Sequence, residues 1–138
     1  MSARVKARKR ALDFLYEADI RGGDPLTLLS ERGAEDLSQI SQAEYAKFLI
    51  SGVQEHRSKI DELITTYAQG WDMDRMPAVD RNILRIAIFE ILWESDLADE
   101  IAASQAVEFA KELSTDDSAG YINGVLGRII ALKPSFSL

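Results

Sequence analysis

The densest apolar segment of the chain lies at residues 80–93, and we expect it to form the central helix of the fold. On a helical wheel its apolar side chains lie on almost every side, at Ile83, Leu84, Ile86, Ala87, Ile88, Phe89, Ile91, Leu92 and Trp93. A helix that is apolar nearly all round is buried, with other elements packed on several of its sides. The segment is too short and too charged to span a membrane. Pro77 and Asp80 mark its start, because proline is tolerated in a first helical turn and an acid is favoured there.

Apolar positions spaced three and four residues apart predict further helices on both sides of this segment. They are expected over residues 1–20, over 25–32, from Ser41, around 60–67, from Asp99 and from Asp117. Residues 33–42 are polar and poorly periodic, which predicts a loop. No stretch alternates apolar and polar residues with β-branched side chains, so no strand is expected. The predicted fold class is therefore all-α, with about seven helices.

The helices are expected to form one compact domain over residues 1–138. Within it we predict two packed helical bundles, the N-terminal one over about 1–70 and the C-terminal one over about 77–133. The intervening segment 71–76 is the expected boundary between the two bundles.

Three glycines lie within the last predicted helix, at Gly120, Gly124 and Gly127. Glycine lowers helix propensity by ~1 kcal/mol at each interior position. We therefore expect that these glycines allow another backbone to come close.

The composition is that of an ordinary globular protein, with 138 residues, 46% of them hydrophobic and 28% charged. The absence of cysteine excludes a disulfide framework and a thiolate metal site. No apolar run follows the basic start of the chain, so we expect neither a signal peptide nor a membrane anchor, and a cytoplasmic location.

The charges are unevenly distributed along the chain. Five of the 16 cations lie within the first twelve residues, where there is no acid, at Arg4, Lys6, Arg8, Lys9 and Arg10. The remaining chain has 11 cations against 23 acids and so carries a charge of −12. Since these five cations are spread round the predicted helix, we expect its first two turns to protrude or fray. A basic arm on an acidic body favours a localised anion-binding site.

Residues suited to catalysis are few. His56, the only histidine, lies in a polar segment where a solvated side chain is the favoured interpretation. Glu90 falls among apolar positions of the central helix, where a buried carboxylate is either a structural hydrogen-bonding group or a general acid. The structural role is favoured, so no enzyme is expected. Two pairs of acids precede helices, where acidic caps are common rather than metal ligands: Asp72 with Asp74, and Asp116 with Asp117.

The basic arm is the stronger functional signal, since clustered cations neutralise phosphates. A solvated tail that only aids solubility is the alternative. Tyr121 lies outside the apolar stripe of the last helix, where a tyrosine either stacks on a single-stranded base or packs against a neighbouring helix.

The chain resembles the NusB family of bacterial transcription antitermination factors. The resemblance is carried by residues 8–16 (RKRALDFLY), 80–87 (DRNILRIA) with Glu90, 106–111 (AVEFAK) and 117–126 (DSAGYINGVL). It covers essentially the whole chain and is densest from residue 77 to residue 130. It implies an all-helical fold of two bundles and no cofactor.

The resemblance also implies a function. Family members bind the boxA element of single-stranded nascent RNA together with NusE, a small-subunit ribosomal protein. They act in an RNA polymerase antitermination complex, chiefly on ribosomal RNA operons. By motif position the RNA contacts are Arg4, Lys6, Arg8, Lys9, Arg10, Tyr16, Asp117 and Tyr121. Asp80 corresponds to the start of the helix that faces NusE, and we expect it to be exposed.

Two features depart from the family pattern. Val5 interrupts what is often an unbroken arginine run, and Tyr121 stands where phenylalanine is common. Some members form homodimers that hide the RNA face, and this chain is a possible homodimer. The alternatives that the sequence leaves open are a helical protein–protein adaptor with a merely solubilising basic start and an enzyme that uses Glu90.

Overall fold

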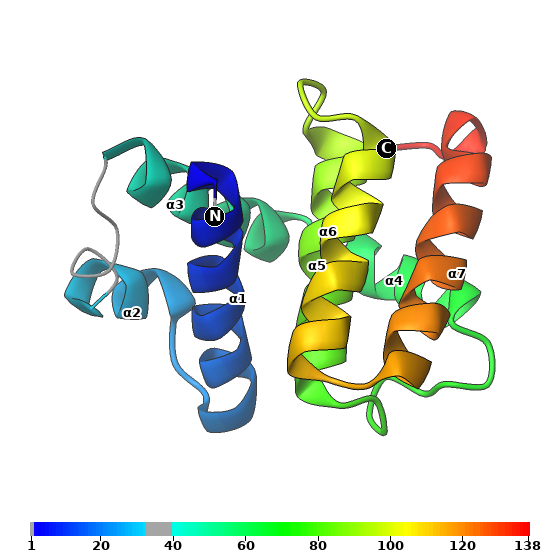
Figure 1. The fold of residues 1–138 in the computed structure, drawn as a ribbon, viewed down its shortest axis with the longest axis horizontal. Coiled ribbons are helices and arrows are strands. Elements are labelled where there is room, and N and C mark those ends of the chain that lie inside the picture. The colour runs from blue at the N-terminus through cyan, green and yellow to red at the C-terminus, as the bar shows by residue number, and fades with distance from the viewer. Residues whose placement is uncertain (1, 33–39) are drawn as a thin grey trace. The chain divides into compact units, whose positions relative to one another are not determined.

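The computed structural model describes residues 2–32 and 40–138, and this part of the chain is all-α, as predicted (Figure 1). In chain order the helices are α1 (Ala3–Arg21), α2 (Pro25–Arg32), α3 (Ile40–Glu55), α4 (Arg57–Tyr67), α5 (Ala78–Trp93), α6 (Asp99–Leu113), α7 (Asp116–Leu132) and the short 3-10 helix η2 (Lys133–Ser135). No strand occurs among these residues. The loop expected over 33–42 lies mainly outside the described residues, and α3 already begins at Ile40. None of the described helices is long and apolar enough to cross a membrane.

The first helix has well-defined ends. The Ser2 side chain accepts a hydrogen bond from the Val5 backbone N–H at 3.2 Å, which caps the helix start. At the other end the Gly22 N–H donates to the Ala18 carbonyl at 2.8 Å, and Gly22 adopts a φ of 81°. Glycine adopts such a positive φ at no steric cost, so α1 ends here.

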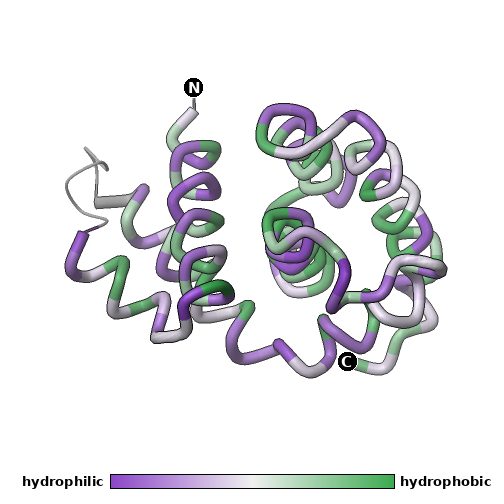
Figure 2. The backbone as a smooth tube through the Cα atoms, turned by 90° about the horizontal axis from the view of Figure 1, so that it is seen from below, coloured by the Kyte–Doolittle hydropathy of each residue, from purple (hydrophilic) through white to green (hydrophobic). Residues whose placement is uncertain are grey.

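The chain divides into two compact units, Met1–Glu55 and His56–Leu138. In the first unit α1 packs on α2 and α3, and α2 packs on α3. Its buried apolar core consists of Ala7, Ala11, Leu12, Phe14, Leu15, Leu29, Ala46, Leu49, Ile50 and Val53. Along the helices, hydrophobic and hydrophilic residues alternate within each turn, which is the pattern of one buried and one exposed face (Figure 2).

The division between the units lies at residues 55/56, whereas the sequence suggested residues 71–76. The helix α4 therefore belongs to the second unit. It packs against α5 and α7, and its buried residues are Ile60, Leu63 and Ile64. Its Asp61 also accepts hydrogen bonds from Arg85 of α5, with 2.9 Å between Nε and Oδ1. This ion pair joins two helices that the sequence pattern had assigned to different bundles.

The helix α5 is the centre of the second unit, as expected. Its buried residues comprise Asp80 and every position from Asn82 to Leu92. It packs against α4, α6 and α7, which cover its sides. The prediction that an all-round apolar helix is the centre of the core is confirmed.

The expectation about the three glycines of α7 is wrong. A Cβ atom built at Gly120, Gly124 or Gly127 would meet no heavy atom within 4 Å. All three residues are exposed. The inward face of α7 is formed instead by Ile122, Val125, Leu126 and Ile129, which do the packing.

The central position of α5 leads to a prediction of stability. We expect Ile86→Ala to lower the free energy of unfolding by about 2–5 kcal/mol, because a large buried side chain leaves a cavity. Ile101→Ala on α6 is the matched control, since Ile101 is 50% exposed and its loss is expected to cost less than about 0.5 kcal/mol. Urea unfolding of both variants measures the difference. Equal effects would contradict the central role of α5.

Candidate nucleic-acid interface

The basic residues near the N-terminus lie on the ordered helix α1 rather than on a frayed arm. The helix begins at Ala3, and Ala7 and Arg8 are both buried, with Arg8 only 3% exposed. The expectation that the first two turns protrude is therefore wrong, because α1 packs against α3 and the second turn is buried at Ala7 and Arg8. Arg8, predicted as an RNA contact, offers little surface to a ligand in this structure.

The other four cations differ in what surrounds them. Arg4 and Lys6 are exposed. Lys9 and Arg10 are half-buried, and both pair with Asp13, at 3.1 Å and 3.3 Å. The Asp13 carboxylate thus offsets part of the positive charge of this turn. The exposed cations at the start of α1 are Arg4 and Lys6, and they are the better candidates for phosphate contacts.

Arg4 is positioned by an aromatic ring of α3. Its guanidinium carbon lies 4.4 Å from the centroid of the Tyr45 ring, within the range of a cation–π interaction. The Arg8 guanidinium lies near the same ring, at 5.8 Å. Nothing in the spacing of Tyr45 along the sequence links it to residue 4, so the sequence pattern does not predict this contact. The contact holds the Arg4 side chain in one place while leaving the residue exposed.

Tyr16, the remaining predicted contact of the first unit, is 40% exposed. Leu12 and Leu15, which precede it by about one helical turn or less, are buried. Tyr16 instead lies at the solvent boundary, where its ring remains accessible to a ligand.

Asp117 and Tyr121 lie in the first turns of α7. This helix is capped by Thr115, whose hydroxyl accepts from the Ser118 N–H at 3.0 Å. Asp117 is exposed and Tyr121 is half-buried. The Tyr121 ring meets Trp71 edge to face, with 4.5 Å between centroids, and its hydroxyl donates to the Gln69 carbonyl. The Tyr121 ring therefore packs against a neighbouring element, and because the residue is only half-buried, its stacking on a base stays a prediction. The sequence pattern missed Trp71, which belongs to no periodic segment.

Asp80 is not exposed, contrary to expectation. Its exposed fraction is 0%, and its Oδ2 accepts a hydrogen bond from the Ser118 hydroxyl at 2.8 Å. Its Oδ1 is buried without a hydrogen-bond partner. The physical reason is that α7 packs on α5 and brings Ser118 against Asp80. Asp80 therefore joins α5 to the turn that carries Asp117, and an effect of Asp80 on a partner is indirect in this geometry.

The structure gives little support for catalysis. His56 is half-buried rather than solvated, and its ring stacks on Trp93 with 3.9 Å between centroids. Glu90 is buried, at 1% exposure, in the last turn of α5. Within residues 2–32 and 40–138 no group of three histidine, cysteine or acidic side chains could hold a metal ion.

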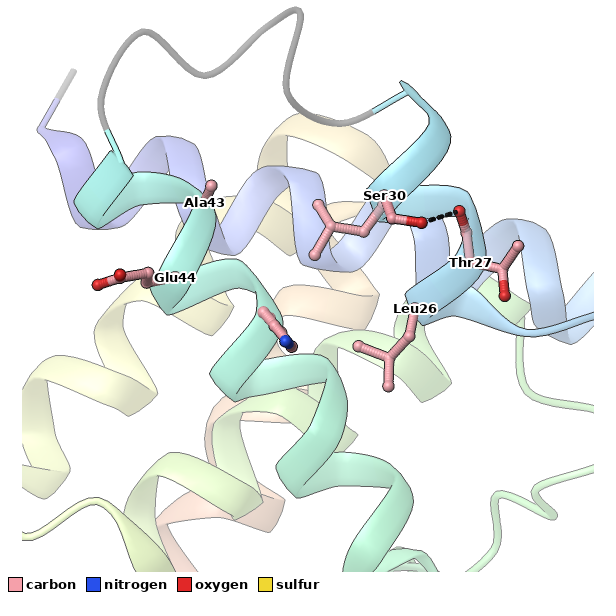
Figure 3. Close-up of a pocket in the computed structure, with 7 residues that line it drawn as sticks. Leu26, Thr27, Ser30, Ala43 and Glu44 are labelled. Atoms are coloured by element: carbon pink, nitrogen blue, oxygen red, sulfur yellow. Dashed lines mark hydrogen bonds between the residues drawn. The ribbon is translucent and has the colours of Figure 1, made fainter.

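A hollow of about 530 Å³ lies between α2 and α3 (Figure 3). Its lining consists of Leu26, Thr27, Leu29, Ser30, Ala43, Glu44 and Lys47. The Ser30 hydroxyl within it donates to the Thr27 carbonyl of its own helix at 3.1 Å. With a single carboxylate and no histidine, the hollow does not assemble a general acid and base, and none of the predicted RNA contacts lines it.

Comparison with known proteins gives a consistent result. The model of the NusB family matches residues 5–131. The transcription antitermination protein NusB of Saccharopolyspora erythraea is 53% identical, and the match covers 96% of this chain and 89% of that protein. The T. maritima NusB structure has a TM-score of 0.84 at 33% identity, covering 93% of this chain and 90% of that one. A crystal structure of the antitermination factors NusB and NusE in complex with dsRNA has a TM-score of 0.85 at 28% identity, covering 95% and 98%.

The contact between Asp80 and Ser118 leads to a testable consequence. We expect Ser118→Ala to lower the free energy of unfolding by about 1–3 kcal/mol, because the buried Asp80 carboxyl group loses its hydroxyl donor. Ser104→Ala on α6 removes the same hydroxyl from an exposed position and serves as control. Chemical denaturation followed by circular dichroism measures both. Equal stability of the two variants would show that the contact contributes nothing.

Proposed function

This chain belongs to the NusB family of transcription antitermination factors, and from that premise we propose that it binds single-stranded boxA-type RNA together with NusE. In this proposal the pair supports an elongating RNA polymerase, chiefly during ribosomal RNA transcription. The proteins of this family are transcription factors and not enzymes. The related complex of NusB, NusE and RNA supports assigning both partners to this chain.

The observation that carries the RNA proposal is the position of Arg4 and Lys6. They are exposed on an ordered helix, and Arg4 is held against Tyr45, so the charge is placed before RNA arrives. The chain outside its first twelve residues carries a charge of −12 and repels a long polyanion. We therefore expect the electrostatic contact of the first unit to lie mainly at this cluster, while exposed rings such as that of Tyr16 offer stacking.

We expect the first unit to engage fewer phosphates than its five clustered cations would allow. Lys9 and Arg10 share Asp13, and Arg8 is buried, so Arg4 and Lys6 carry most of the electrostatic contact. For single strands the logarithm of the binding constant falls with the logarithm of salt at a slope of about −0.7 per neutralised phosphate.

We expect the double variant Arg4→Gln with Lys6→Gln to make this slope shallower by about 1.4, because two phosphate contacts are lost. Fluorescence anisotropy of a labelled boxA-type RNA at several salt concentrations measures the slope. Arg21→Gln with Lys47→Gln removes the same charge from other exposed positions and is expected to leave the slope nearly unchanged. If the first variant also keeps the original slope, the basic start only aids solubility and the helical adaptor becomes the better description.

The NusE proposal rests on the acidic body of the chain, with Asp80 in an indirect role. Opposite charge on a partner speeds association and makes its rate sensitive to salt. Because Asp80 is buried against Ser118, we propose that it acts on NusE only by holding the start of α7.

This indirect role predicts that Asp80→Asn and Ser118→Ala lower the rate of association with NusE by similar factors. Surface plasmon resonance measures both rates at a temperature where both variants are folded, with Ser104→Ala as the variant that keeps the contact. A much larger loss for Asp80→Asn alone would mean that the carboxyl group touches NusE directly.

A further inference from the structure

The loop after α4 brings a tryptophan against Tyr121, a residue that is predicted to contact RNA. The rings of Trp71 and Tyr121 lie 4.5 Å apart with an interplanar angle of 71°. Both residues are half-buried, so each keeps part of its surface open to solvent. In Figure 1 this loop, drawn in green, runs beside the first turns of α7.

Several hydrogen bonds fix the loop in this position. The Tyr121 hydroxyl donates to the Gln69 carbonyl, and the Trp71 N–H donates to the Ala68 carbonyl at 3.1 Å. Further along the loop, Nη1 of Arg81 donates to the Met73 carbonyl at 2.7 Å. Trp71 is thus placed before any ligand arrives, and the hydroxyl of Tyr121 is used within the protein rather than offered to RNA.

The surface beside the two rings is open and leads toward a cation. Gly124 follows Tyr121 by one turn on the same stripe, and a Cβ atom there would meet nothing within 4 Å. Arg128, one turn further, is exposed, and its guanidinium carbon lies 5.8 Å from the centroid of the Tyr67 ring. The rise of an α-helix places Arg128 about 10 Å beyond Tyr121 along the axis. A base at the rings therefore leaves its phosphate chain with an unobstructed path past a positive charge.

We propose that Trp71 is a base-stacking residue, and that Trp71 and Tyr121 together bind one unpaired base of single-stranded RNA. This inference rests on the proposed RNA-binding function and extends its site to the loop between α4 and α5. Aromatic rings stack on bases of any sequence, since every base has a π-face. Partly exposed paired rings next to a bare helix face and an arginine suit a flexible nucleotide chain better than a flat protein surface.

The experiment uses the tryptophan as its own probe. The chain has two tryptophans, and Trp93→Phe leaves Trp71 as the only one. Trp93 stacks on His56 and belongs to no predicted RNA contact, so this variant is expected to bind RNA with unchanged affinity. When a boxA-type single-stranded RNA is added, stacking is expected to quench the emission of Trp71 in step with binding measured by anisotropy of the labelled RNA.

The possible failures are distinguishable. RNA binding with unchanged Trp71 emission overturns this inference and leaves the proposed function intact. Absence of RNA binding overturns the proposed function and this inference with it. Emission that responds to NusE alone and not to RNA would make the ring pair a protein contact and would also overturn the inference.

Variants separate stacking from charge. Trp71→Ala is expected to weaken RNA binding about 5-fold to 150-fold with an unchanged salt slope, because a stacked base and no phosphate contact is lost. Trp71→Phe keeps an aromatic face and is expected to restore most of the affinity. Tyr121→Phe keeps its ring but loses the bond to Gln69, so we expect a smaller loss and weaker quenching of Trp71. Binding by Trp71→Ala that equals that of the unaltered protein would overturn the inference, and Trp71→Phe with the fluorescence titration provides the test if Trp71→Ala does not fold.

Discussion

The helix α5 has to remove apolar side chains from water on every side, and the arrangement of the second unit depends on this requirement. Burial of large apolar side chains contributes roughly 1.5–3 kcal/mol each. Because the apolar side chains of α5 point in all directions, a single neighbouring helix could bury only some of them. The three helices α4, α6 and α7 share the task. Polar groups within the same helix then fix the details. Arg85 is buried, and it donates to Asp61 of α4 and to Asn82 one turn earlier, at 2.9 Å and 3.1 Å. A buried charge without such partners would be strongly destabilising, so the position of α4 is set by charge as well as by packing.

Much of this fold could be predicted from the sequence because the signals are local. The all-round apolar character of α5 is a property of its own sixteen residues, and so are the stop at Gly22 and the cap before α7. The predictions that were wrong concern residues whose exposure depends on how the helices pack against one another. From the sequence, Asp80 is expected to be an exposed acid in the first turn of α5, but α7 places Ser118 against it. Arg8 is expected to be an exposed cation, but it is buried because α1 packs on α3.

The candidate RNA surface shows the same limit. The residues that match the family motif, such as Asp117 and Tyr121, were identified by their order along the chain. Tyr45, which lies against Arg4, and Trp71, which lies against Tyr121, carry no such signal, because each meets its partner only in the folded structure. Fewer cations are open to a phosphate than the sequence suggests. Asp13 lies one helical turn from Lys9 on the same face and competes with a phosphate for its ammonium group.

The exposed glycines of α7 also affect how this helix loses its structure on unfolding. Gly120, Gly124 and Gly127 lower the intrinsic stability of this helix by ~1 kcal/mol each, and the space beside each of them is open rather than filled by a neighbouring helix. Helices in proteins draw most of their stability from packing, and α7 depends on it more than most. The turn that carries Asp117 and Tyr121 should therefore open together with the core around α5, as one cooperative unit. The alanine-rich α1, which carries Arg4 and Lys6, belongs to a separate compact unit. Amide hydrogen exchange would then report two protection levels, one for α7 and one for α1, because the two helices open in different events.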